Sequence, residues 1–267
     1  MTTNSTTNSN SSPWLVPDWP DAPPNIGFLC TTRLGGVSPG PYGDGQGGGG
    51  LNLGLHVEDS AENVARNRAL LRAQLPAEPV WLSQVHGTVV VDAATAADAA
   101  AGVPVADASI GRSPGVVCAV QTADCLPVLF ADVDGRVVGA AHAGWRGLAA
   151  GVLEDTVEAM RTAGAGEISA WLGPAIGPQK FEVGQEVKDA FVARSSDAAI
   201  AFHRALGSAE GKHLADIYAL ARQSLARAGV ARISGGDRCT VTEADVFYSY
   251  RRDRVTGRQA TLIWIKN

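Results

Sequence analysis

The stretch Val116–Ala141, V-V-C-A-V-Q-T-A-D-C-L-P-V-L-F-A-D-V-D-G-R-V-V-G-A-A, decides the fold of this chain. It contains three apolar segments, which we interpret as strands over 116–120, 127–133 and 136–141. Asp134-Gly135 separates the last two and is a strong signal for a hairpin turn. A long apolar-periodic segment over 147–163 follows and predicts a helix, and 168–172 reads as a further strand. The centre of the chain is therefore predicted to be a sheet covered by at least one helix.

The same patterns extend this interpretation in both directions. A helix is expected to start near Asp59, with Glu62 as its capping-box partner. Further helices are expected over 184–193 and 214–228, and further strands over 26–32, 51–55, 80–86, 88–92, 247–250 and 259–265. No linker or internal repeat divides the chain. We expect one α+β domain over residues 13–267, with mixed β-sheets and flanking helices, preceded by a disordered polar tail over 1–12.

Composition excludes several classes of protein. The chain has 267 residues, a formal net charge of −5 and only 18% charged residues, so nucleic-acid or anionic-membrane binding is not expected as its purpose. No apolar run reaches the roughly 18 residues of a membrane-spanning helix. The first twelve residues lack the features of a signal peptide, which predicts a cytoplasmic location. Four cysteines without a C-x-x-C pair do not form a disulfide framework.

Three residues with metal-binding side chains lie at the ends of apolar segments. These are His86 in S-Q-V-H-G, Cys125 in A-D-C-L-P and His142 in A-H-A-G-W, each close to glycine or proline. A strand that ends at such a residue leaves the side chain at the rim of a sheet. Two imidazoles and a thiolate form a three-ligand set suited to catalytic zinc, with a fourth position open. Taken singly, each residue also fits a structural role, for example Cys125 as a small buried hydrophobe.

Seven motifs in order resemble the laccase-domain family, also known as polyphenol oxidase or peptidoglycan editing factor and linked to purine nucleoside phosphorolysis. They are F-L-C-T-T-R-L-G-G-V-S (28–38), L-N-L-G-L-H-V (51–57), S-Q-V-H-G (83–87), T-A-D-C-L-P-V (122–128), H-A-G-W-R-G (142–147), A-W-L-G-P-A-I-G-P (170–178) and F-Y-S-Y-R-R-D (247–253). The resemblance implies a compact α+β fold and a zinc site at His86, Cys125 and His142. It also implies phosphate-dependent cleavage of adenosine, inosine and S-methyl-5′-thioadenosine, with some adenosine deamination.

Phosphorolysis also requires a cation for phosphate. Arg33 is our first candidate, because it follows a strand and precedes a glycine-rich loop, and Arg146 near His142 is the second. Asp124, next to Cys125, is a candidate for orienting a ligand histidine or for carrying a proton. Trp145 is a candidate for stacking on a purine, but we favour core packing, the commoner role of a tryptophan near a helix start, and we interpret Arg251 as part of a solvated edge or an ion pair. The partners are then small molecules, namely purine nucleosides and phosphate, and the protein is expected to be a monomer or a weak homodimer.

Four alternative functions remain open at this stage. The family's older name suggests a copper-dependent polyphenol oxidase, with Cu²⁺ as the alternative metal. Five histidines and two methionines are few for multicopper chemistry. Cys125 with His86 or His142 as its base suggests a metal-free cysteine hydrolase. A zinc amidase that edits a mis-incorporated amino acid in a peptidoglycan precursor would share the metal site, and a non-enzymatic binding module would not need it.

Overall fold

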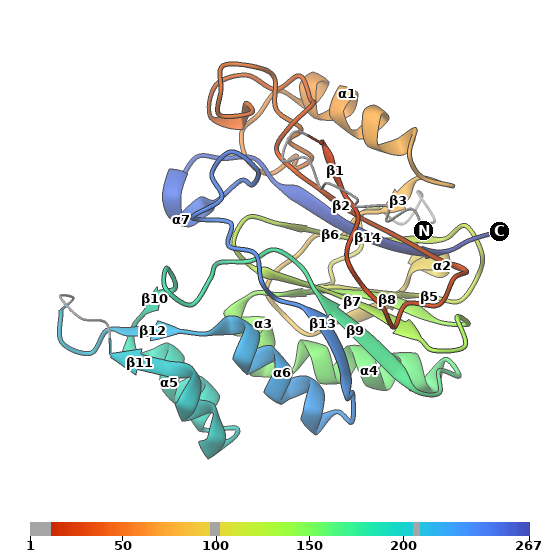
Figure 1. The fold of residues 1–267 in the computed structure, drawn as a ribbon. Helices are drawn as coiled ribbons and strands as arrows, with labels where there is room; N and C mark the ends of the chain where they lie inside the picture. The colour runs from red at the N-terminus through yellow and green to blue at the C-terminus, as the bar shows by residue number, and fades with distance from the viewer. Residues whose placement is uncertain (1–11, 97–101, 205–208) are drawn as a thin grey trace, which may run out of the picture.

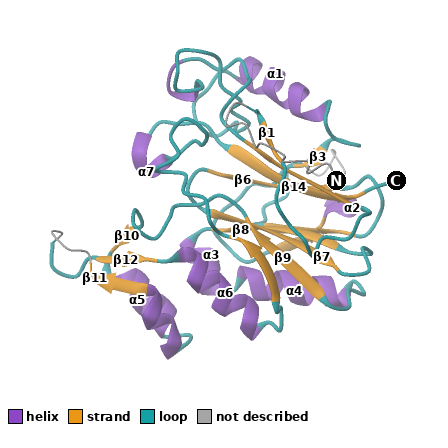
Figure 2. Ribbon diagram, viewed as in Figure 1, coloured by secondary structure: helices purple, strands orange, loops and turns teal. Residues whose placement is uncertain are grey.

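Two stacked β-sheets with helices on both outer sides organise the protein in a computed structural model that describes residues 12–96, 102–204 and 209–267 (Figures 1 and 2). Helix α1 (Ala61–Arg72) lies on one outer side of the stack, and α3 (Trp145–Ala150), α4 (Val152–Thr162) and α6 (Ile217–Arg227) lie on the other. This is the α+β architecture with mixed sheets that the sequence predicts. The expected tail over 1–12 lies, except for Ser12, outside the described residues.

The strands form three sheets. The five-stranded sheet has the order β1 (Trp14–Leu15), β2 (Ile26–Thr31), β14 (Gln259–Ile265), β6 (Val117–Thr122), β3 (Pro79–Val80). The six-stranded sheet has the order β13 (Arg232–Gly235), β9 (Ile168–Leu172), β7 (Leu126–Asp132), β8 (Val138–Ala143), β5 (Ala108–Gly111), β4 (Val90–Asp92). A small sheet of β10 (Glu182–Val183), β12 (His213–Ala215) and β11 (Phe202–Arg204) lies at one side of the stack with α5 (Gln185–Val192). The remaining short helices within the described residues are η1 (Gly40–Tyr42), α2 (Ala93–Ala96), η3 (Ser196–Ala201) and α7 (Tyr250–Asp253).

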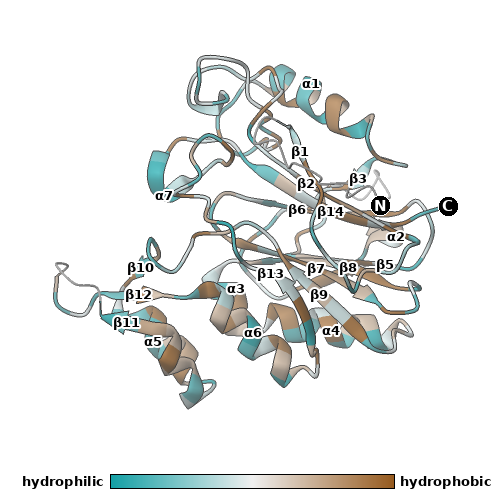
Figure 3. Cartoon of the chain, in the orientation of Figure 1, coloured by the Kyte–Doolittle hydropathy of each residue, from teal (hydrophilic) through white to brown (hydrophobic). Residues whose placement is uncertain are grey.

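The core strands are apolar on both faces because both faces are covered. In β6, Cys118 faces the six-stranded sheet, whereas Ala119 belongs to the cluster with Leu71 of α1. In β7, Leu129 packs between the two sheets, whereas Phe130 packs against the helices on the other side. Alternate residues of a strand point to opposite faces, so a strand with two buried faces reads as a continuous apolar run. Hydrophobic residues accordingly gather on the central strands and on the helices that cover them (Figure 3).

The predicted hairpin at Asp134-Gly135 is confirmed. Strands β7 and β8 pair antiparallel, with Leu126 opposite Ala143 and Pro127 opposite His142. Gly135 has a φ of +69°, a left-handed conformation that glycine adopts without strain. The register places the first residues of β7 next to the last residues of β8, at one end of these two central strands. Cys125 and His142 therefore meet there, although the hairpin turn separates them in the chain.

Two predicted strands are wrong. Residues 51–55 form no ladder, because Leu51 N–H donates to the carbonyl of Arg33 and Leu53 N–H to that of Arg258. Residues 247–249 form a buried irregular segment, and Tyr250 is the exposed first residue of α7, which Ser249 caps by accepting from the N–H of Arg252. Residues 51–54 and 247–249 are buried, and burial by itself does not produce strand pairing.

Other elements differ from prediction in their limits. The helix predicted over 147–163 is two helices, broken at Gly151, whose φ is +113°. The strand predicted over 80–86 is reduced to β3 and an isolated bridge between Ser83 and Val105, and the chain bends at His86 and Gly87. Helix α1 begins at Ala61, and the predicted capping residue Asp59 instead accepts hydrogen bonds from Ser38 and Asn52. Within the described residues, no helix is both long and apolar enough to cross a bilayer.

Candidate metal centre

His86, Cys125 and His142 come together at the end of the six-stranded sheet where β7 begins. One ligand atom from each residue lies within 4.8 Å of the other two. The separation between Cys125 Sγ and His86 Nε2 is 3.7 Å, and the two imidazole rings meet edge to face with centroids 4.8 Å apart. In the described part of the chain this is the one group of three or more histidine, cysteine and acidic residues with metal-binding spacing. The structure thus brings together the three ligands that the sequence predicts.

Backbone turns place each of these side chains. Asp124 has a φ of +91° and His86 a φ of +62°, so both ligand segments turn sharply beside the sheet edge. Gly144 directly follows the end of β8. A Cβ atom at this position would lie 2.5 Å from Cδ2 of His86 and 3.2 Å from Sγ of Cys125. Only glycine therefore lets β8 approach the other two ligands this closely.

Asp107 connects the two ligand histidines and was missed by the sequence analysis. Its buried carboxylate accepts from the ring Nδ1 of His142 at 2.8 Å and from the backbone N–H of His86 at 2.9 Å. It also accepts from the N–H groups of Val85 and Gly87, at 3.2 and 2.6 Å. Burial works against its ionisation, but these hydrogen bonds keep its pKa below the usual range. An aspartate between small apolar residues, A-D-A-S, is the only local signal for it.

The thiol of Cys125 is activated. Burial opposes its ionisation, but the positive charge of His142 and hydrogen bonds from both histidines outweigh burial and lower its pKa to about 6. For His142, burial favours the neutral ring, but the charge of Cys125 and the hydrogen bond to Asp107 raise its pKa to about 9. Cysteine and histidine thus form a thiolate–imidazolium pair, from which a metal would displace the histidine proton.

The donor set fits a zinc ion. About 3.5 Å is the distance expected between two ligand atoms of a tetrahedral zinc site with N and S donors, close to the 3.7 Å between Cys125 and His86. With Nδ1 of His142 bonded to Asp107, the lone pair of Nε2 remains for a metal. Three protein ligands would leave the fourth coordination position of a zinc ion open. Two of the three, Cys125 and His86, line a cavity. The chemistry of the residues therefore suits a catalytic rather than a closed structural metal site.

The adjoining cavity measures about 240 Å³ and is lined by aromatic, aliphatic and charged side chains. It is lined by His86, Ala123, Asp124, Cys125, Trp145, Arg146, Ile176, Phe181, Ile217, Tyr250 and Arg251. Trp145 and Arg146 come from the start of α3, whereas Tyr250 and Arg251 come from α7, far along the chain. Trp145, interpreted above as core packing, and Arg251, interpreted as a surface residue, both reach this cavity.

The two arginines proposed for phosphate differ in position. Arg146 lines the cavity, and its guanidinium stacks on the Trp145 ring at 4.4 Å without a hydrogen-bond partner among the described residues. Arg33 does not line the cavity. Its guanidinium donates to the carbonyls of Gly43 and Ala244 and lies over the ring of Tyr248. The structure therefore brings Arg146, but not Arg33, to the metal ligands.

Asp124 is at the cavity but does not hold a ligand histidine. Its two carboxylate oxygens accept from the hydroxyl of Thr240 and the N–H of Arg251, both at 2.6 Å. These bonds tie the segment that carries Cys125 to the start of α7. The role of orienting a histidine, proposed for Asp124 from its position in the sequence, is occupied by Asp107.

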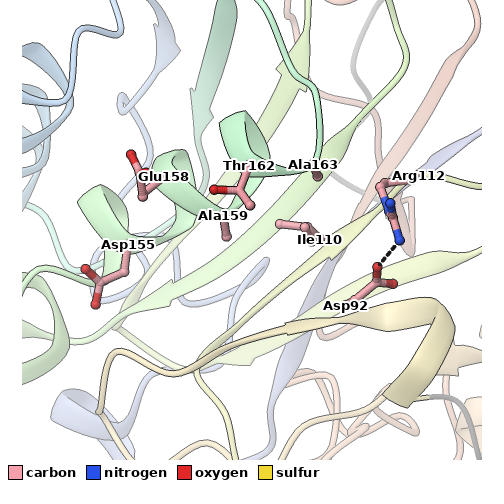
Figure 4. Close-up of a pocket in the computed structure, with 8 residues that line it drawn as sticks. All are labelled: Asp92, Ile110, Arg112, Asp155, Glu158, Ala159, Thr162 and Ala163. Atoms are coloured by element: carbon pink, nitrogen blue, oxygen red, sulfur yellow. Dashed lines mark hydrogen bonds and ion pairs between the residues drawn. The ribbon is translucent and has the colours of Figure 1, made fainter.

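A larger hollow of about 560 Å³ lies elsewhere, between α4 and the strands β4 and β5 (Figure 4). Acidic residues Asp155 and Glu158 project from α4, and Arg112 pairs with Asp92 at 3.0 Å across the opening. None of the three metal ligands lines it. It is wide open, so size alone does not make it the functional site.

The sequence of the chain is similar over most of its length to a known protein family and to several named proteins. Residues 27–266 match the family model described as "Multi-copper polyphenol oxidoreductase laccase". The chain belongs to this family. It is 51% identical over 253 residues to "Purine nucleoside phosphorylase YfiH" of Escherichia coli, covering 94% of this chain and 98% of that protein. It is 50% identical to "Purine nucleoside phosphorylase PA4543" of Pseudomonas aeruginosa, covering 95% and 99%.

Solved structures of the family have the same fold. Protein NMB0706 of Neisseria meningitidis superimposes with a TM-score of 0.86 at 51% identity, covering 96% of this chain and 100% of that one. YlmD of Geobacillus stearothermophilus gives a TM-score of 0.84 at 32% identity, covering 96% and 97%. The resemblance drawn from the seven motifs is thereby confirmed for the family and for the α+β fold.

Proposed function

We propose that this protein is a zinc-dependent purine nucleoside phosphorylase that acts on adenosine, inosine and S-methyl-5′-thioadenosine, with adenosine deamination as a side activity. The observation that carries the proposal is a His–Cys–His group beside a cavity lined by aromatic side chains and by the guanidinium of Arg146, which has no hydrogen-bond partner among the described residues. Relatives that match nearly the whole chain and are named purine nucleoside phosphorylase support the same reaction.

The reaction requires the cavity to hold two substrates. Phosphorolysis breaks the bond between ribose C1′ and a base nitrogen and forms a bond from C1′ to a phosphate oxygen. The base leaves with the bonding electron pair and takes up a proton. Phosphate therefore needs a cation, and the base needs a surface on which to be held while the bond breaks.

Arg146 and the aromatic residues meet these needs. The guanidinium of Arg146 has its N–H donors available for the paired oxygens of a phosphate, and its stacking on Trp145 fixes its direction. Trp145, Phe181 and Tyr250 offer ring faces to a purine, and stacked rings contribute about 0.5–1.5 kcal/mol beyond area burial. Cys125, His86 and His142 would hold zinc. When bound, zinc supplies a Lewis acid that polarises a substrate oxygen or activates water.

The multicopper activity in the family's description is not our proposal. In the described residues only one group has metal-binding spacing, whereas multicopper chemistry requires several. A blue-copper site commonly adds a weak methionine ligand, and Met160 of α4 is fully buried in the core against β8. Four free thiols fit the reducing cytoplasm that we propose as the location.

The direct test is a product assay with adenosine and phosphate that measures adenine and ribose 1-phosphate. We expect both products in equal amounts from the zinc-loaded protein and neither from Cys125→Ala. As a matched control, His203→Ala removes an exposed histidine on β11 and should leave turnover unchanged. Adenine without ribose 1-phosphate, or release of adenine that does not need phosphate, contradicts phosphorolysis, whereas phosphate-independent formation of inosine reports the deaminase side activity.

One alternative has a specific observation in its favour. The lowered pKa of Cys125 and its contact with His86 also suit a metal-free cysteine hydrolase. Removal of zinc with a chelator separates the two: the phosphorylase loses turnover and regains it with added zinc, whereas a cysteine hydrolase keeps its activity. A zinc amidase shares the metal site and is tested by replacing the nucleoside with an amide substrate.

A further inference from the structure

Asp107 is the buried acidic residue in contact with both candidate histidine ligands. We infer that it is the positioning residue of the metal centre: one carboxylate sets the ring of His142 and the backbone turn of His86, and thereby determines metal affinity. The inference rests on the metal centre of the proposed function, but it assigns a role that the three ligands themselves do not explain.

The contact with His142 sets which ring nitrogen faces the metal. Oδ1 of Asp107 lies 2.8 Å from Nδ1 of His142, and the side chains of both residues are almost completely buried. The backbone N–H of His142 also donates to the carbonyl of Asp107, at 2.7 Å. A carboxylate accepts only, so Nδ1 must carry a proton, and Nε2 is the ring nitrogen that would bind a metal once its own proton is displaced. His142 is thus held in one tautomer and one orientation.

The contact with His86 acts through the backbone. The left-handed conformation of His86 turns the N–H groups of Val85, His86 and Gly87 toward one point, as in an anion-binding nest. The carboxylate of Asp107 occupies this point, with all three donors within 3.2 Å. A non-glycine residue in this conformation is strained and persists only when its surroundings hold it. Asp107 is the group that holds His86 in this conformation. The backbone turn at His86 then directs its imidazole toward Cys125.

One oxygen of Asp107, Oδ1, takes part both in the contact with His86 and in the contact with His142. It accepts both from the N–H of His86 and from the ring of His142. A displacement of this oxygen therefore moves both histidines together. Cys125, in contrast, is placed by the β7–β8 register and has no hydrogen bond to Asp107 among the contacts of the described residues.

Asp107→Asn tests the inference with little change of volume. The asparagine amide has one acceptor oxygen. Its NH₂ group would face N–H groups that, in the wild type, donate hydrogen bonds to the carboxylate. We expect zinc affinity, measured by competition with a chromophoric chelator, to fall about 10–100-fold, the range found for partners of metal-binding histidines. Asp132→Asn is the matched control: Asp132 is equally buried and hydrogen-bonded, but lies at the far end of β7 from Cys125. It should keep its zinc affinity within threefold of the wild type.

A double variant tests whether both histidines depend on Asp107. If Asp107 also acts through His86, adding Asp107→Asn to His142→Ala lowers zinc affinity further. If the double variant binds zinc as His142→Ala does, the contribution through His86 is overturned. Folded Asp107→Asn protein with zinc affinity within threefold of the wild type overturns the inference as a whole.

A measurement on the wild type keeps the test valid even if Asp107→Asn does not fold. Histidine ¹H–¹⁵N spectra of the zinc-loaded protein should show His142 with a proton on Nδ1 and zinc on Nε2. Zinc on Nδ1, or no zinc bound at all, overturns the inference. If zinc binds as described but adenosine and phosphate give no ribose 1-phosphate, the inference stands and the proposed phosphorylase activity fails.

Discussion

The cavity beside the metal ligands and the body of the fold use the same residue types in opposite ways. Cys118 lies within β6 and is fully buried, whereas Cys125 lies just before β7 and lines the cavity. Arg33 directs its donors to backbone carbonyls, whereas Arg146 has no such partner in the described chain. The comparison teaches that position relative to a strand end and satisfaction of hydrogen bonds, rather than residue type, separate structural from functional side chains.

The largest effect is expected from the ligand itself. Cys125→Ala removes the thiolate, and we expect at least a thousandfold loss of phosphorolysis together with loss of stoichiometric zinc. Zinc content is measured by elemental analysis and turnover by chromatography of adenine. Cys239→Ala, in a separate cavity, is the control and should retain zinc. Full activity of Cys125→Ala would remove the distinction between the two regions.

The thiols should also differ in reactivity once zinc is removed. Burial raises the pKa of Cys30 to about 11 and that of Cys118 to about 12, whereas that of Cys125 is about 6. The thiolate fraction of Cys125 therefore rises as pH increases through 6, and that of the two buried cysteines stays small up to pH 9. Iodoacetamide labelling followed by peptide mass spectrometry should favour Cys125 at least 100-fold at pH 7. Zinc should protect it, and equal labelling of Cys118 would contradict the comparison.

Arg33→Ala should affect folding rather than catalysis. It leaves the carbonyls of Gly43 and Ala244 without their guanidinium donors, which costs roughly 2–3 kcal/mol of unfolding free energy. Urea unfolding measures this loss. The Michaelis constant for phosphate should stay within twofold of the wild type in the folded enzyme. A tenfold rise without a change in stability would return Arg33 to the phosphate site.

Arg146→Ala should affect phosphate binding rather than folding, and we expect its effect to be the smallest of these predicted effects. Its guanidinium is exposed, so the unfolding free energy should change by less than about 0.5 kcal/mol. The Michaelis constant for phosphate should rise about tenfold, because a charge-assisted contact to the anion is lost. Arg146→Lys keeps the charge but not the paired donors, and should lie between the two. An unchanged constant in Arg146→Ala would assign phosphate binding to another group.

Local patterns in the sequence were sufficient for much of the fold and for choosing the three candidate ligands, whose role in metal binding stays a prediction. Strands β7, β8 and β9 follow from apolar runs and the Asp-Gly turn, and His86, Cys125 and His142, chosen for their places at strand ends, lie together in the structure. Prediction failed at 51–55 and 247–250, where apolar residues are buried in irregular segments. Hydrophobicity reports burial, and pairing depends on whether a neighbouring strand is present.

The sequence by itself determined the sheet-forming segments, the hairpin and the three metal-binding residue types, because these depend on alternation, turn residues and chemistry within a few positions. Only the tertiary structure decided which polar groups serve the site. It brought Asp107 to both histidines, tied Asp124 to Thr240, and placed Phe181 and Tyr250 beside Trp145. The physical reason is that a hydrogen bond or a cavity wall joins residues far apart in the chain, and their partners exist only after the two sheets have packed.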